Sequence, residues 1–129
     1  MTIDERTVLR VIRLERSDAC ELADDVGAEA TILRDDSPPI GGYGDRGTRT
    51  VAVIVTARAL RAVARYLAAH QHSQDEAVSL AVQIDDPTGT RREEMLTYKA
   101  SPGQPTAEAA ATALRALPGI DEALRRSLW

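Results

Sequence analysis

The fold is decided by residues 77–99, which read AVSLAVQIDDPTGTRREEMLTYK. Every second residue of a strand points to the same side, and the alternating apolar side chains here are Val78, Leu80, Val82 and Ile84. Residues 85–90 contain proline and glycine and predict a turn, so residues 94–99 complete an antiparallel hairpin. The alternation indicates a sheet with one covered face and one face partly exposed to water.

Three further strands are expected before this hairpin. Residues 7–14, 30–34 and 50–55 are short runs rich in β-branched and apolar residues. Residues 35–47 hold two prolines and four glycines, which exclude regular structure, so they are predicted to form the longest loop.

The first helix is expected over residues 19–26. Ser17 offers an N-cap and Gly27 a common helix stop. The spacing places Cys20 and Ala23 on one side, so Cys20 is expected to be a small buried residue.

A second helix is expected to begin after Thr56, as its cap, and to run to about His70. Its core-facing positions have helical spacing, and they are Leu60, Val63, Ala64 and Leu67. Thr106 is expected to cap an Ala-rich helix ending near residues 118–119, and Asp121 a last turn to Trp129.

Together these elements predict an α+β fold. The sheet is expected to be small, antiparallel or mixed, with four or five strands in the order β-α-β-β-α-β-β-α and helices mainly on one face. Residues 1–129 are expected to be a single domain, with an α+β core over 7–100 and a helical segment over 106–129. Residues 50–56 either extend the sheet or lengthen the helix that follows.

Composition excludes several classes of protein. The formal net charge of −4 gives no reason to expect nucleic-acid binding. Cys20 is the only cysteine, so no internal disulfide can form and a reducing cytoplasm is expected. The acidic N-terminus is unlike a signal peptide, and no apolar run reaches the roughly 18 residues of a membrane span. Neither export nor a membrane partner is therefore expected.

The glycine-rich part of the long loop has the spacing of a dinucleotide-binding motif, GYGDRG over residues 42–47. That motif functions between a strand and a helix, whose N-terminal amides meet a pyrophosphate. Here prolines precede it and a β-branched run follows, so an ordinary loop without a cofactor is favoured. A long loop is still a candidate contact surface, and its contact residues are expected to be Tyr43, Asp45 and Arg46.

A second candidate contact surface is an arginine face on the predicted helix over 57–70, formed by Arg58, Arg61 and Arg65. These residues share the side opposite the apolar positions. They are suited to gripping phosphate or an acidic partner surface, although a solvated helix face is the more ordinary interpretation.

Metal-ligating and catalytic residue types are present without a coherent pattern. His70 and His72 lie close to Asp75 and Glu76, but residues two apart on a helix diverge, so no metal site is predicted. Adjacent carboxylates such as Asp85 and Asp86 do not face a common point. No catalytic residue is therefore assigned.

The chain resembles a known family in its succession of elements. The resembling segments are TILR at 31–34 leading into Ser37-Pro38-Pro39, the glycine-rich stretch, ALRAVARYL at 59–67, and the hairpin over 81–97 around DDPTG. Over about residues 7–100 they resemble the effector-associated constant component family of bacterial, especially actinobacterial, conflict systems. The resemblance implies a non-catalytic module that couples an effector, such as a protease, to its partners. It brings no catalytic residues to this chain.

These observations lead to a first expectation of a cytoplasmic, non-enzymatic protein-interaction or adaptor module whose partner is an effector or a second copy. The alternative is a small enzyme or ligand-binding protein with a pocket under loop 37–47. A nucleic-acid binder that uses the arginine face is a third, less favoured hypothesis, and it predicts salt-sensitive association.

Overall fold

The computed structural model describes residues 6–34, 48–70 and 77–127, which form five strands and four helices. Their bounds are β1 Val8–Leu14, α1 Arg16–Val26, β2 Ala30–Arg34, β3 Arg49–Ile54, α2 Ala57–Ala69, β4 Val78–Asp85, β5 Arg91–Tyr98, α3 Thr106–Ala116 and α4 Ile120–Ser127. The predicted α+β class is confirmed. Residues 49–54 extend the sheet, which resolves the ambiguity at this position in favour of a strand.

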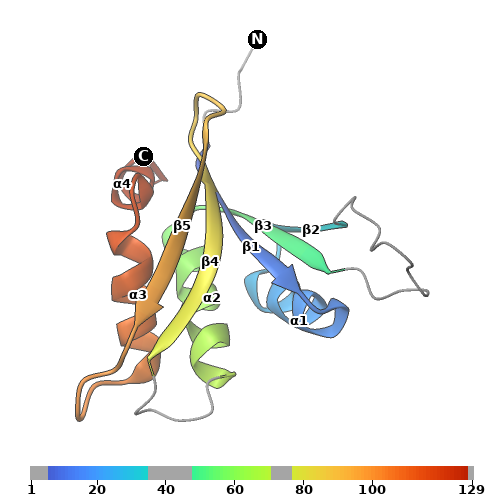
Figure 1. Ribbon diagram of the computed structural model, residues 1–129. Helices are drawn as coiled ribbons and strands as arrows, with labels where there is room; N and C mark the ends of the chain where they lie inside the picture. Colours follow the sequence, from blue (N-terminus) through green and yellow to red (C-terminus); the bar gives the residue numbers. More distant parts are fainter. Residues whose placement is uncertain (1–5, 35–47, 71–76, 128–129) are drawn as a thin grey trace.

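The five strands form one antiparallel sheet in the order β2-β3-β1-β4-β5 (Figure 1). Strands β1 and β2, joined through α1, lie on either side of β3. Strands β3 and β4, joined through α2, lie on either side of β1. This interleaving of two βαβ units is the ferredoxin-like arrangement, and β5 extends it by a hairpin at one edge.

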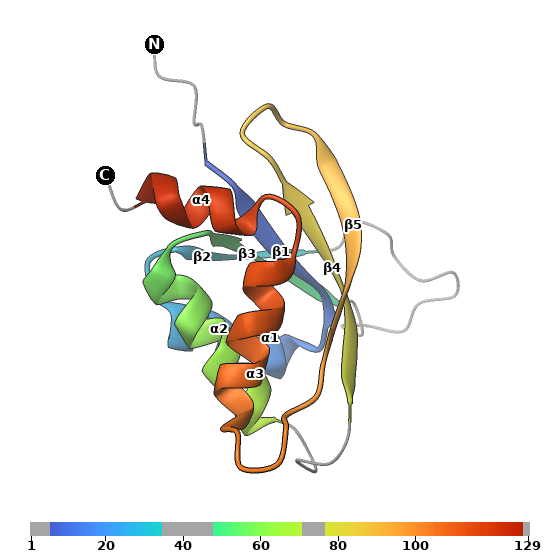
Figure 2. The ribbon, with the colours of Figure 1, turned by 90° about the vertical axis from the view of Figure 1, so that its left-hand side faces the viewer.

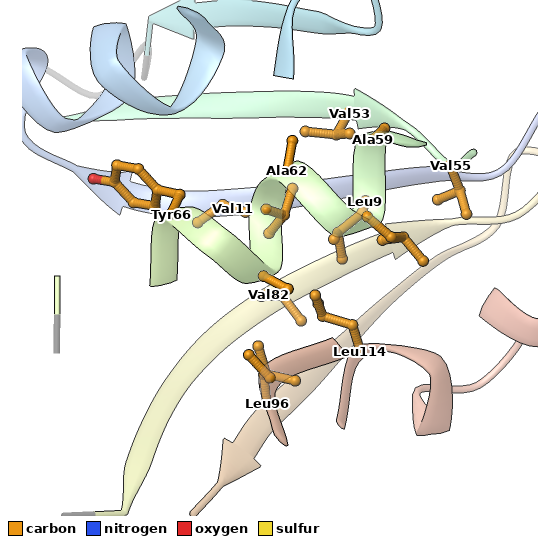
Figure 3. Close-up of a cluster of buried hydrophobic side chains, with 14 of the residues drawn as sticks. Leu9, Val11, Val53, Val55, Ala59, Ala62, Tyr66, Val82, Leu96 and Leu114 are labelled. Carbon is orange, nitrogen blue, oxygen red and sulfur yellow. The ribbon is translucent and has the colours of Figure 1, made fainter. Parts of the chain in front are cut away.

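All four helices lie on the same face of the sheet (Figures 1 and 2). The inward side chains of the strands meet α2 and α3 there, and Figure 3 shows Leu9, Val53, Val82 and Leu96 converging on this layer. Among the described residues, the core consists mainly of Leu, Val, Ile and Ala, with Tyr66 and Tyr98 as its buried aromatic residues. The opposite face of the sheet carries no helix among the described residues.

The start of α1 differs from the sequence prediction. Glu15 is the N-cap, without a side-chain cap bond, and Ser17 lies inside the helix. The buried residues are Ala19, Leu22 and Val26, so the apolar stripe is displaced from the predicted one. Cys20 is exposed, and the expectation that it is buried was wrong.

Gly27 ends α1 as predicted, with φ 85° and ψ −134°, a conformation open mainly to glycine. Its amide donates to the carbonyl oxygen of Ala23 at 2.8 Å.

The start of α2 follows the sequence prediction closely. Thr56 has an extended backbone, and its Oγ1 accepts a hydrogen bond from the amide of Ala59 at 3.0 Å. Leu60, Val63 and Ala64 are buried, and Leu67 is half-buried against the core.

Two other predicted caps were wrong. Thr106 is the first residue of α3 after Pro105, and no side chain caps that helix. Asp121 lies within the first turn of α4, where its negative charge is favourable without capping.

Candidate functional site

The side of the sheet opposite the helices is the candidate interaction surface, and we call it the open face. The strand register places on it alternate residues of the strands, except that β1 is irregular between Val11 and Leu14. Its apolar members are Val8, Ile12, Leu33, Ala52, Ile54, Ala81 and Met95.

Central strands β1 and β3 carry apolar residues on both faces. Leu9 and Val53 are fully buried beneath the helices, whereas Val8 and Ile54 are paired with each other on the open face. An antiparallel sheet with one face in water usually alternates apolar and polar residues, so apolar residues on both faces of these strands depart from that pattern. Met95 on edge strand β5 is 60% exposed, which extends the apolar surface to the rim. The other apolar side chains of the open face are half-buried rather than exposed, so each keeps part of its surface in contact with water.

A cluster of three charged residues, Asp85, Arg10 and Arg91, lies on the open face beside these apolar residues. Asp85 accepts hydrogen bonds from Arg10 Nε at 2.9 Å and from Arg91 Nε at 2.7 Å. Burial alone raises the pKa of the Asp85 carboxyl group, but the hydrogen bonds from Arg91 and Arg10 outweigh that effect and lower it. Asp85 therefore remains a carboxylate that holds both guanidinium groups in place.

The charges that the register places on this face balance. Arg10 and Arg91 contribute two positive charges, and Asp85 and Glu93 contribute two negative charges. These four charges therefore sum to zero and are mixed in sign.

The structure describes only some of the predicted contact residues. Tyr43, Asp45 and Arg46 lie outside the described residues, as does the pocket expected under loop 37–47. Arg58, Arg61 and Arg65 are exposed on α2, and α2 lies on the opposite side of the sheet from the open face (Figure 2).

Members of the arginine face have different neighbours. Arg58 approaches the C-terminal end of α1 near Gly27, where a positive charge is favourable. Arg61 lines a shallow hollow beside α3, and Arg65 lines a different one beside Asp25 of α1. The face therefore does not form one binding cradle.

A cleft of about 370 Å³ lies between the β4–β5 turn and the α3–α4 junction. Its polar lining residues include Asp86, Thr88, Arg92 and Glu122. The Asp86 carboxylate already accepts hydrogen bonds from the Thr88 hydroxyl and from the amides of Thr88 and Thr90, and these bonds lower its pKa. Asp86 therefore stabilises the turn.

One group of metal-ligating side chains does converge, and we call it the acid–histidine cluster. Asp18 and Glu21 are three residues apart on α1, and His70 is the C-cap of α2. One ligand atom from each lies within 4.8 Å of the others. His70 Nε2 is 2.9 Å from Glu21 Oε2, and the two residues are 49 positions apart in the chain.

The sequence interpretation considered donors next to His70 and missed both acids. The available signal was the spacing of Asp18 and Glu21 on one helix face, which identifies no partner by itself.

Comparisons with family models, with curated proteins and with solved structures gave no match. Among the described residues, no helix combines the length and the apolar character needed to cross a membrane.

Proposed function

We propose that this chain is a non-enzymatic protein-interaction module whose contact surface is the open face of the sheet. The observation that carries the proposal is the pair of central strands with apolar side chains on both faces, only one of which is covered by the described helices (Figure 1). The transfer of apolar surface from water into contact with a partner is favourable, so it stabilises the complex.

We assign the open face to a second copy of the same chain. Five strands about 4.8 Å apart, with about seven residues of about 3.4 Å each, make a face of roughly 24 by 24 Å. Two copies would bury roughly 1,100 Å², which reaches the about 1,000 Å² that a specific interface needs. The area is thus sufficient for a dimer.

Charge also favours a second copy over nucleic acid. An isologous interface brings a surface against itself, so the balanced charges of Arg10, Arg91, Asp85 and Glu93 limit net repulsion. Arg10 and Arg91 already share Asp85, so they need no phosphate for neutralisation. A nucleic-acid surface would require excess positive charge.

The wider form of the proposal is an adaptor that acts in the cytoplasm, where a lone exposed thiol such as Cys20 stays reduced. Coupling an effector in a conflict system, which the family resemblance implies, belongs to this wider form. Neighbouring reading frames that encode a protease or nucleotidase effector would support it, and a metabolic neighbourhood would count against it.

The test is the mass of the chain in solution, by sedimentation equilibrium at micromolar concentration. We expect twice the 14.0 kDa of one chain. Ala52→Glu places a charge on the open face at a half-buried position of β3 opposite Arg10, and should give a monomer. The control is Thr112→Glu, which adds the same charge on the exposed side of α3 and should remain a dimer.

A wild-type chain that stays monomeric throughout the concentration range would overturn the assignment. So would an Ala52→Glu variant with the wild-type mass. Circular dichroism of both variants verifies that a change in mass does not come from unfolding.

A further inference from the structure

We propose that the acid–histidine cluster is a binding site for a divalent transition-metal ion of the zinc class, held by His70 Nε2 and one carboxylate oxygen each from Asp18 and Glu21. The site joins α1 to the end of α2. It is independent of the open face, because it lies in the helical layer on the other side of the sheet.

The separations of the donor atoms suit one ion. Zinc binds imidazole nitrogen and carboxylate oxygen at about 2.0–2.2 Å, so neighbouring ligand atoms around the ion lie about 3 to 4 Å apart. The distance of 2.9 Å between His70 Nε2 and Glu21 Oε2 is already close to that value. All three donors lie within 4.8 Å, so a change in the side-chain torsions of Asp18 and Glu21 is enough to close the set.

The imidazole is oriented as metal-binding histidines are. A carbonyl oxygen can only accept a hydrogen bond, so the 2.9 Å contact with the Tyr66 carbonyl means that His70 Nδ1 carries a proton and donates it. The Tyr66 ring stacks on the imidazole, with centroids 4.1 Å apart. Nε2 is therefore directed toward the carboxylates, and a hydrogen bond of this kind at the other ring nitrogen fixes a ligand histidine in the correct tautomer.

When no metal ion is bound, a proton on His70 Nε2 bridges the imidazole and the Glu21 carboxylate. Glu21 can only accept, so the short contact requires a proton on Nε2 as well, and His70 is then an imidazolium ion. An incoming metal ion releases this Nε2 proton to solvent.

The local charge favours a dication. Asp18 has no ion pair within the described parts of the chain, and two carboxylates beside one imidazolium leave a net charge of −1. A dication with a neutral imidazole brings the cluster to zero.

The donor set also selects among metal ions. Imidazole suits zinc, nickel and copper, whereas calcium takes six to eight oxygen ligands and magnesium retains water. Three protein ligands leave a coordination position for water, and both Glu21 and His70 are exposed enough to allow it.

The experiment is calorimetric titration of the metal-free, full-length chain with zinc chloride at neutral pH, with cobalt absorption as a spectroscopic readout of the ligand field. One ion per chain is expected, and calcium should give no binding heat. Asp18→Asn, Glu21→Gln and His70→Gln should each weaken zinc binding by at least about tenfold.

Two controls separate a built site from nonspecific attraction. Asp24→Asn removes a negative charge from the exposed side of α1 without removing a donor, and His72→Gln removes the other histidine of the chain. Both should bind zinc as the wild type does, and so should Ala52→Glu, whatever its oligomeric state. No zinc uptake by the wild type would overturn the proposal. It would also be overturned if the three donor variants kept wild-type affinity, or if Asp24→Asn weakened binding as much as they do.

Discussion

Replacing Asp85 by Asn tests the charged group on the open face. The side chain of Arg10 is 22% exposed and that of Arg91 is 50% exposed, so their hydrogen bonds to Asp85 contribute different amounts to the free energy of unfolding. A partly buried bond to a charged group contributes about 1–1.5 kcal/mol, and an exposed ion pair contributes at most about 0.5 kcal/mol. We therefore expect Asp85→Asn to lower the free energy of unfolding by about 1–2 kcal/mol at neutral pH.

The same difference should depend on pH. Burial raises the pKa of Asp85, but the hydrogen bonds from Arg91 and Arg10 outweigh it, so the folded-state pKa lies below the ordinary value of 3.8. Its contribution to stability is thus complete above about pH 4 and is lost as the pH falls through the lower folded-state pKa. The difference between wild type and Asp85→Asn should be constant from about pH 7 to about pH 5 and should shrink below about pH 4.

The assay is urea unfolding followed by circular dichroism, at one fixed protein concentration because association also changes apparent stability. Arg10→Gln should cost about 1 kcal/mol and Arg91→Gln at most about 0.5 kcal/mol, in the order of their burial. The reasoning is refuted if Arg91→Gln costs more than Arg10→Gln. It is equally refuted if the Asp85→Asn difference is as large at about pH 3 as at about pH 7.

Three further substitutions test the helices and the core by the same unfolding assay. Thr56→Ala removes the cap bond to the amide of Ala59 and should cost about 1 kcal/mol, whereas Thr56→Ser should restore most of it. Gly27→Ala forces a side chain into a backbone with φ 85° and should cost about 1–3 kcal/mol; a neutral result would contradict that backbone conformation. The hydroxyl of Tyr98 is buried without a hydrogen-bond partner within the described residues, so Tyr98→Phe should stabilise the protein by about 1 kcal/mol. A loss of stability in that variant would mean that the hydroxyl is bonded after all.

The elements that could be predicted from the sequence are those with a local signal. The alternation over 78–84 and the β-branched run before Thr56 each specify a strand without knowledge of the remaining chain. The prediction that Thr56 caps α2 was correct because a strand ends just before it and leaves its backbone extended. The prediction that Ser17 caps α1 was wrong because the helix begins earlier, after Glu15, whose side chain makes no cap hydrogen bond.

The face of α1 was wrong for a related reason. Short helices with many alanines and acids have several similar apolar stripes, and tertiary packing selects one of them. Here Leu22 is buried and Cys20 is exposed. The phase of such a helix depends on the sheet beneath it.

Both candidate sites bring together residues that are far apart in the sequence, and no short stretch of sequence indicates such contacts. The open face exists only because β1 lies between β3 and β4 with all described helices on the other side. The acid–histidine cluster joins Glu21 to His70 across 49 residues. Neither juxtaposition follows from spacing along one element.

The most direct test of the central claim is a distance measured between two copies of the chain. A spin label on Cys20, the single exposed thiol, reports from the outer side of α1. Sheets pack about 10 Å apart and a helix is about 10–12 Å thick, so two copies joined through their open faces should place the labels at least about 30 Å apart. We predict a dipolar distance at or above that value, which disappears in Ala52→Glu. A distance below about 20 Å would place the helical layers in contact, and the absence of any dipolar signal would mean that the open face binds no second copy.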